Sequence, residues 1–427
     1  MKTRSLLAIV LLALALALGV GTAAPASAHA ELDWTVPSVN TTLKSCPSHV
    51  IMHFTEAVAS GGLTVMAGTK ALLAQAAVDN ETFVVATAGR CGTHALALQW
   101  RTVSADDGHI ASGSVSYKIG ATASPATAAR VLASPGTPLL GSQPAIVTFR
   151  TLGYLALAAF IGGLTFLCLV WPAGAEVVSS RRLLVVAVLM GVLSSIGQLF
   201  GAAAQTTSSY DLSGVLDQAF GREYAAMGLL WLLAGVVVVD LLQRGRPVLE
   251  RFGWRFAAAL VGAGLVFMEG RSAHAVQASD SGWGTVSDFL HITSMSIWVG
   301  GLFMLVACVL PRRQLLELDT VVPRFSTLAQ IAVIGVVASG LFLVCEIIAP
   351  IPDFWDTRYA RVLAIKLIVL STALLAALFS KRWVDRRTEG RRSTGVRAIV
   401  LSIGAETVLA LGVLAAAGTL ATTSPGL

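Results

Sequence analysis

The stretch VSDFLHITSMSIWVGGLFMLVACVL, residues 286–310, decides the fold of the larger part of the chain. Its only ionisable side chains, apart from one cysteine, are Asp288 and His291, and the rest is apolar or hydroxyl-bearing. A transmembrane helix needs roughly 20 predominantly apolar residues to cross the hydrocarbon core. We therefore expect this stretch to span a membrane.

Seven further runs on both sides of this stretch are long enough to cross a bilayer. They cover residues 150–171, 183–204, 225–242, 254–268, 325–348, 361–379 and 398–420. The composition agrees, because 55% of the 427 residues are hydrophobic and 13% are charged. We predict an all-α bundle of eight transmembrane helices over residues 146–420, followed by a short external tail at 421–427.

The loops between the predicted spans differ in positive charge, which predicts the orientation. One set of alternate loops and helix ends carries sixteen Lys and Arg residues, from Arg181 to Arg397. The opposite set carries Arg150, Arg222, Arg271, Arg358 and Arg361. The positive-inside rule therefore predicts a multi-pass protein of the plasma (inner) membrane with both termini on the extracytoplasmic side.

Residues 1–28 have the pattern of a secretory signal peptide. Basic residues precede an apolar run, and the small residues Ala26-Ser27-Ala28 follow it as an A-x-A cleavage motif. Cleavage there would make His29 the first residue of the mature chain. The alternative is an uncleaved anchor helix, for which the apolar run is short.

Residues 29–120 have the composition of an exported soluble domain. Apolar and polar residues alternate at 50–58, 96–103 and 112–119, and Gly, Ser, Asn and Asp clusters separate these runs. This pattern predicts a small antiparallel, immunoglobulin-like β-sandwich. Residues 121–145, rich in Ala, Ser, Thr and Pro, are predicted to be a flexible linker.

The exported segment carries almost no net charge. Residues 29–145 hold seven acidic and six basic side chains, so the formal net charge of +6 comes from the rest of the chain. This segment therefore has no basic surface for phosphate groups, and a nucleic-acid-binding protein is excluded.

Two of the five cysteines, Cys46 and Cys91, lie in the exported segment. An oxidising exterior favours a disulfide between them, with a two-thiol site for a soft metal as the alternative. Cys168, Cys308 and Cys345 lie in apolar runs and are interpreted as packing residues.

The predicted mature N-terminus suggests a metal site. His29 would offer its α-amine and its imidazole to one ion, and Asp107-Gly108-His109 would add a carboxylate and a second imidazole. Gly108 permits the tight backbone that brings such ligands together. Nitrogen-rich coordination with one oxygen ligand suits Cu(II). The sequence thus predicts a Cu(II) site, although a D-G-H turn is common in proteins.

A second group of donors lies in the stretch quoted at the start. At helical spacing, Asp288, His291, Met295 and Trp298 share one face, and imidazole and thioether groups bind copper. His274 precedes them and could join this face as part of a membrane copper path, with copper as Cu(I) or Cu(II). The alternative is a polar cluster that holds two helices together, with Asp288 as a helix N-cap.

Motifs in both halves carry resemblances to known families. His29 after a signal peptide, His53-Phe54-Thr55-Glu56-Ala57-Val58 and Asp107-Gly108-His109-Ile110-Ala111-Ser112-Gly113 resemble the CopC copper-binding family. That resemblance implies a histidine-brace Cu(II) site formed by His29, Asp107 and His109. Asp288-x-x-His291 with Trp298-Val299-Gly300-Gly301, the motif at Tyr359 to Lys366, and Glu406 resemble the CopD family of inner-membrane copper proteins. Lys366 and Glu406 could form an intramembrane ion pair or a proton relay.

The residues and resemblances together predict a copper-uptake and tolerance protein that is not an enzyme. Its partners would be copper, the lipid bilayer and an external copper chaperone or reductase. ATP is not expected, because the motif G-x-x-x-x-G-K-[ST] is missing from the sequence. The alternatives are a membrane redox protein using haem or copper, and a copper sensor or metallochaperone without transport.

Overall fold

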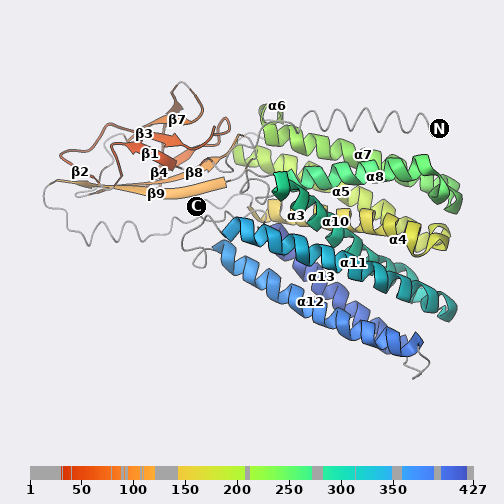
Figure 1. Cartoon of the computed structure of the whole chain (residues 1–427). Coiled ribbons are helices and arrows are strands. Elements are labelled where there is room, and N and C mark those ends of the chain that lie inside the picture. Colours follow the sequence, from red (N-terminus) through yellow and green to blue (C-terminus); the bar gives the residue numbers. More distant parts are fainter. Residues whose placement is uncertain are drawn as a thin grey trace. The chain divides into compact units, whose positions relative to one another are not determined.

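The chain divides into two compact units, which are described separately here (Figure 1). The β unit is Ala24–Ala145, with which Leu199–Arg222 clusters, and the helical unit comprises Ile146–Gln198 and Glu223–Leu427. The structure is a computed structural model that describes residues 30, 32–39, 41–77, 79–87, 91, 95–105, 108, 110–120, 143–206, 212–271, 282–312, 314–348, 358–388 and 396–420.

The β unit consists of two sheets. The four-stranded sheet has the order β1 (Leu32–Val36), β3 (His49–Phe54), β7 (Thr82–Ala86), β6 (Ala74–Ala76). The five-stranded sheet has the order β2 (Thr42–Leu43), β9 (Ile110–Ile119), β8 (Ala95–Val103), β4 (Thr64–Ala67), β5 (Lys70–Leu72). Every described pair is antiparallel except β2 and β9, which are parallel. The predicted all-antiparallel pairing is therefore wrong at this edge of the second sheet.

One apolar core joins the two sheets. Alternate residues of β3, namely Val50, Met52 and Phe54, are fully buried, and Leu98 and Tyr117 of the second sheet belong to the same cluster. Side chains alternate between the two faces of a strand, so a strand with one buried face has this pattern in its sequence. Each such buried side chain contributes about 1.5–3 kcal/mol to folding. The predicted strand at 50–58 ends early, at Phe54.

A disulfide joins Cys46 and Cys91, with an S–S distance of 2.03 Å and a Cα–Cα distance of 5.8 Å. Of the two alternatives for these thiols, the structure has the disulfide. Cys46 precedes β3 and Cys91 precedes β8, so the bond lies at the end of the β unit where both strands begin.

Long helices and short helical connectors make up the helical unit. They are α3 (Gln143–Leu157), η1 (Ala158–Gly162), α4 (Gly163–Leu169), η2 (Pro172–Glu176), α5 (Val178–Thr206), α7 (Ala219–Arg244), η3 (Arg246–Glu250), α8 (Phe252–Arg271), α10 (Gly282–Met304), η4 (Leu305–Val309), η5 (Leu310–Arg312), α11 (Leu315–Ile348), α12 (Arg358–Thr388) and α13 (Val396–Leu420). A five-residue helix, α6 (Leu212–Leu216), precedes α7.

Six segments among the described residues are long and apolar enough to cross a membrane. They are Val147–Leu169, Val178–Ala203, Ala219–Arg244, Phe252–Gly270, Trp283–Arg312 and Leu316–Cys345. These correspond to the first six predicted spans. In α13 the qualifying part is shorter, Ile403–Gly418, and α12 is not among the six. The prediction of several membrane-spanning helices is confirmed, whereas the number eight stays a prediction.

α10 packs very closely on η1, and glycines make this contact possible. A Cβ atom added at Gly300 would lie 1.9 Å from the carbonyl oxygen of Ala158, and one at Gly162 would lie 2.3 Å from that of Ser296. No side chain larger than hydrogen fits at either distance, so α10 is fixed against the first span.

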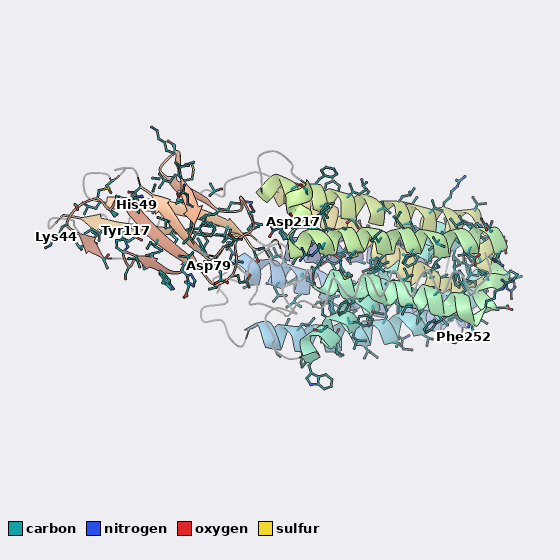
Figure 2. The ribbon with its side chains drawn as sticks, turned by 90° about the horizontal axis from the view of Figure 1, so that it is seen from above. Lys44, His49, Asp79, Tyr117, Asp217 and Phe252 are labelled. Carbon is teal, nitrogen blue, oxygen red and sulfur yellow. A yellow bond between two sulfur atoms is a disulfide. The ribbon has the colours of Figure 1, made fainter. Side chains whose placement is uncertain are left out.

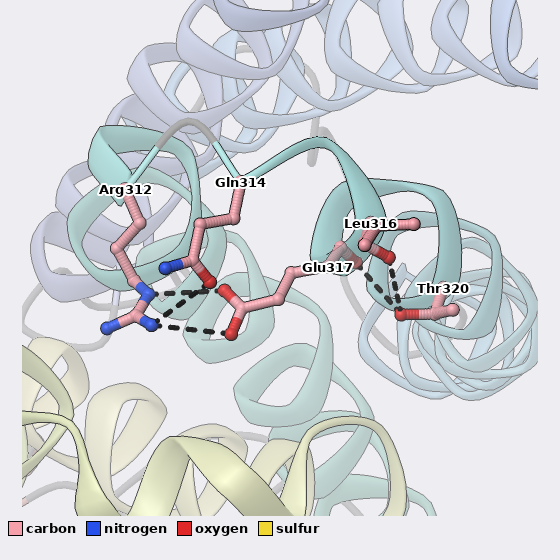
Figure 3. A network of polar contacts seen from close by, with 5 residues as sticks. All are labelled: Arg312, Gln314, Leu316, Glu317 and Thr320. Atoms are coloured by element: carbon pink, nitrogen blue, oxygen red, sulfur yellow. Dashed lines mark hydrogen bonds and ion pairs between the residues drawn. The ribbon is translucent and has the colours of Figure 1, made fainter.

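Charged residues gather where the connectors η2, η3 and η5 meet the helices. Arg181 pairs with Glu176 at 2.8 Å, and Glu176 also accepts a hydrogen bond from the backbone N–H of Arg246. Arg312 donates from Nε to Glu317 at 3.1 Å (Figure 3). Its guanidinium also lies over the ring of Trp171. We call this region the arginine end of the helical unit.

Candidate functional site

The three predicted Cu(II) ligands of the β unit, His29, Asp107 and His109, lie outside the described residues. Their neighbours are described. Gly108 has φ +72°, a left-handed conformation that glycine adopts without steric cost. This conformation is compatible with the tight turn predicted between β8 and β9, and the convergence of the ligands stays a prediction.

Ala30, the residue after His29, is anchored in the core of the β unit. It is fully buried, and its carbonyl accepts a hydrogen bond of 2.6 Å from Thr102 Oγ1. Thr102 pairs with Ala111 across the hairpin that contains the Asp107-Gly108-His109 turn. The chain that follows His29 is therefore held within a few residues of the turn that carries the other two predicted ligands.

A buried carboxylate, Glu56, lies at the same end of the β unit. Glu56 is 4% exposed, and its Oε2 accepts a hydrogen bond of 2.9 Å from Ser104 Oγ, which is fully buried. Glu56 is not among the ligands predicted from the sequence. A signal was present, because Glu56 continues the buried alternation of Val50, Met52 and Phe54. A carboxylate in a buried position needs a hydrogen-bond or cation partner, so Glu56 is a candidate site residue.

The predicted polar face of α10 exists and is buried. Asp288 and Met295 are each 6% exposed, and Trp298 is 1% exposed. Asp288 points at α8, where a Cβ added at Gly270 would lie 2.4 Å from its Oδ2. That oxygen is buried and accepts no hydrogen bond from the described residues. A buried carboxylate oxygen without a donor favours an approaching cation.

His291 is held by α11. Its Nδ1 lies 3.1 Å from Ser339 Oγ, and a Cβ at Gly340 would lie 3.1 Å from its Cε1. Ser339 Oγ itself donates to the carbonyl of Gly335 at 2.5 Å, so it accepts from the ring. This network assigns the ring proton to Nδ1 and leaves the lone pair on Nε2, the nitrogen that could bind a metal.

Charged side chains of three other helices act on this face. Lys366 of α12 interacts electrostatically with Asp288 and His291. Glu269 of α8 interacts with Asp288 and with Arg150 of α3. Charges of both signs therefore lie near the donors of α10.

The remaining predicted membrane residues are only partly placed. His274 lies outside the described residues. Glu406 is 5% exposed on α13, and its pairing with Lys366 stays a prediction, whereas the carboxylate recorded as acting on Lys366 is Asp288. Within the described part of the chain, no group of three or more His, Cys, Asp or Glu residues could hold a metal ion. Asp288, His291 and the thioether of Met295 are the donors that α10 offers.

Comparisons with known proteins relate both units to copper families. Residues 32–120 match the family model described as CopC domain, and residues 319–420 match that of copper resistance protein D. Over 389 residues the chain is 28% identical to the copper transport protein CutJ of Bacillus subtilis (strain 168), and the alignment covers 84% of this chain and 69% of that protein. The predicted occurrence of CopC and CopD regions in one chain is confirmed.

A solved structure is also similar to part of the chain. CopC from Methylosinus trichosporium OB3b is 18% identical, with a TM-score of 0.19, and the match covers 21% of this chain and 93% of that one.

Proposed function

We propose that this chain, which joins a CopC domain to a CopD region, captures Cu(II) outside the cell and passes copper through its helical unit into the cytoplasm. The observation that carries the proposal is the buried face of α10, where Asp288, His291 and Met295 follow one another within a membrane-spanning segment. Ionisable residues inside a span are costly and mark an ion path by default. The likeness to a copper transport protein supports copper as the cargo.

Capture is assigned to a histidine brace of His29, Asp107 and His109. The anchoring of Ala30 beside Thr102 and the left-handed Gly108 support this assignment, because both bring the two parts of the proposed site together. An α-amine, two imidazoles and a carboxylate suit Cu(II). Glu56, buried at the same end of the β unit, would add negative charge near the ion.

Passage is assigned to Asp288, His291 and Met295, with His274 before them. The imidazole Nε2 and the thioether suit Cu(I), and the carboxylate stabilises either oxidation state. Capture of Cu(II) followed by passage of Cu(I) requires one electron per ion, which an external reductase would supply. The positive charge of Lys366, which acts electrostatically on Asp288, would oppose a cation that enters this face.

The proposed topology has eight spans, with α12 and α13 completing the six that qualify by length and composition. The arginine end would face the cytoplasm, and both termini would lie outside a plasma (inner) membrane. A signal peptide at residues 1–28 would deliver the β unit to that side. We assign no catalysis and no use of ATP, so the gradient or the membrane potential would drive transport.

Copper uptake by cells tests the proposal. Cells lacking their own importer would express the full chain, the His291→Ala/Met295→Leu variant, or Val286→Ala, at an exposed position of the same helix, as a matched control. We expect the double variant to lose most of the copper accumulation, measured by mass spectrometry of washed cells at equal membrane protein levels, and Val286→Ala to retain it. Equal copper content in cells with and without the unmodified chain would refute transport and favour a binding or sensing role.

A further inference from the structure

A groove lies on the helical unit between α4, α8 and α10. Its volume is about 360 Å³, and small-molecule sites in proteins measure roughly 300–1,000 Å³. From α8 it is lined by small residues such as Ala259 and Gly262, whereas α4 and α10 contribute larger apolar side chains such as Leu164 and Phe289. The small residues of α8 leave the space that the groove occupies, and its apolar walls suit a hydrocarbon chain.

The length of the groove matches one leaflet of a bilayer. Arg255 and Val266, both on α8, line the groove, and the helix between them is about 16 Å long at roughly 1.5 Å per residue. A hydrocarbon core of about 30 Å gives each leaflet about 15 Å. A fatty acyl chain entering beside Arg255 would therefore reach the middle of the membrane within the groove.

The Arg255 end of the groove has the features of a membrane interface. Phe252 and Phe256, in the first two turns of α8, are 81% and 44% exposed, and their rings stack at 6.1 Å. Figure 2 shows Phe252 at one end of the helical unit. Exposed aromatic residues beside arginine are typical of the level of the lipid headgroups.

The side chain of Arg255 is positioned by η3, the connector that precedes its helix. Its Nε donates to the carbonyl of Leu249, and this is the only side-chain hydrogen bond of Arg255 within the described part of the chain. The N–H groups of Nη1 and Nη2 therefore remain available to a ligand. A guanidinium binds a phosphate group through such paired N–H donors.

We propose that this groove binds one anionic phospholipid, with an acyl chain along α8 and the phosphate on Arg255. The proposal is independent of copper transport, since no residue of the α10 polar face lines the groove. The charge of Arg255 decides the class of ligand. A prenylated quinone would fill the apolar part but would leave the guanidinium without a counter-ion.

Native mass spectrometry of the full chain, purified in detergent, tests the proposal with phosphatidylglycerol and phosphatidylcholine of identical acyl chains. Both lipids carry a phosphate, but the choline ammonium of phosphatidylcholine offsets its charge, whereas phosphatidylglycerol has a net negative charge. We therefore expect the unmodified protein to retain phosphatidylglycerol about tenfold more tightly. Arg255→Gln should abolish this preference. Ala259→Leu, at an exposed position on the groove wall, should weaken the binding of both lipids.

Arg182→Gln is the matched control, since Arg182 is exposed on α5 at the arginine end and does not line the groove. It should keep the preference for phosphatidylglycerol. Equal effects of Arg255→Gln and Arg182→Gln would overturn the proposal, as would unchanged lipid binding in Ala259→Leu. A quinone could instead be extracted from the purified protein, in a smaller amount from Ala259→Leu than from the unmodified chain. That result would assign the groove to a quinone and would also overturn the proposal.

Discussion

Replacement of Cys46 and Cys91 by serine is expected to destabilise the β unit strongly while leaving copper binding intact. The two cysteines are 45 residues apart in the sequence. A cross-link that closes a loop of this length lowers the entropy of the unfolded chain by about 13 cal/mol/K, which is about 4 kcal/mol at 25 °C. That is a large fraction of the roughly 5–15 kcal/mol by which a typical domain is stable.

Copper binding should survive because the disulfide and the proposed Cu(II) site lie at opposite ends of the strands. Cys91 precedes β8 (Ala95–Val103), and the turn with Gly108 follows it. A nine-residue strand is about 26 Å long at a rise of roughly 3.3 Å per residue. Removal of the disulfide therefore raises the entropy of the unfolded chain and alters only the end of the β unit that holds Cys46 and Cys91. The surroundings of the proposed copper ligands stay the same.

Urea denaturation of the isolated β unit, followed by tryptophan fluorescence, measures the loss of stability. Cu(II) titration at urea concentrations below the unfolding transition of the variant measures copper affinity. Ser45→Ala, at an exposed position beside Cys46, serves as the control and should change neither quantity. A loss of stability below about 1 kcal/mol would refute the loop-entropy argument. A copper affinity that falls together with stability would refute the separation of the two ends.

Three further predictions follow from the packing and the charges. Glu56→Gln keeps the hydrogen bond with Ser104 but removes a buried negative charge, so Cu(II) affinity in titration should fall by about tenfold with little loss of stability. Gly300→Ala would place a Cβ 1.9 Å from the Ala158 carbonyl oxygen and should cost at least about 1–3 kcal/mol, seen as a lower melting temperature in detergent. Gly404→Ala, where a Cβ meets nothing within 4 Å, should be tolerated, and equal melting of the two variants would contradict the packing argument. Lys366→Met removes a cation near Asp288 and should tighten Cu(I) binding by the full chain, measured by competition with a chromogenic chelator; weaker binding would show that Lys366 supports the site.

Much of the architecture was predictable because apolar length and alternation are properties of the sequence alone. Runs such as 286–310 predict spans without knowledge of their neighbours, and the alternation at Val50, Met52 and Phe54 gives the buried face of β3. The parallel pairing of the short strand β2 with β9 was not predictable, because strands of two residues carry no periodic signal.

The candidate sites also have a part that the sequence predicts and a part that depends on packing. The helical spacing of Asp288, His291 and Met295 placed them on one face of α10, which the structure buries. The partner of His291, Ser339, and the approach of Lys366 to Asp288 depend on how α11 and α12 pack against α10. Contacts between distant helices have no signature in a single sequence. Glu56 follows the buried positions of β3, but an alternating strand pattern predicts apolar residues there and does not indicate that a carboxylate is buried.

The most direct test of the central claim is Cu(II) titration of the isolated β unit, followed by electron paramagnetic resonance of the copper-loaded protein. Protein beginning at His29 is compared with protein carrying one additional N-terminal residue, which converts the free α-amine into an amide. The proposed brace predicts that protein beginning at His29 binds Cu(II) tightly and gives a type-2 copper spectrum. It also predicts that the additional residue sharply lowers the Cu(II) affinity. Equal affinity and equal spectra for the two forms would contradict the brace and remove the capture step from the proposed function.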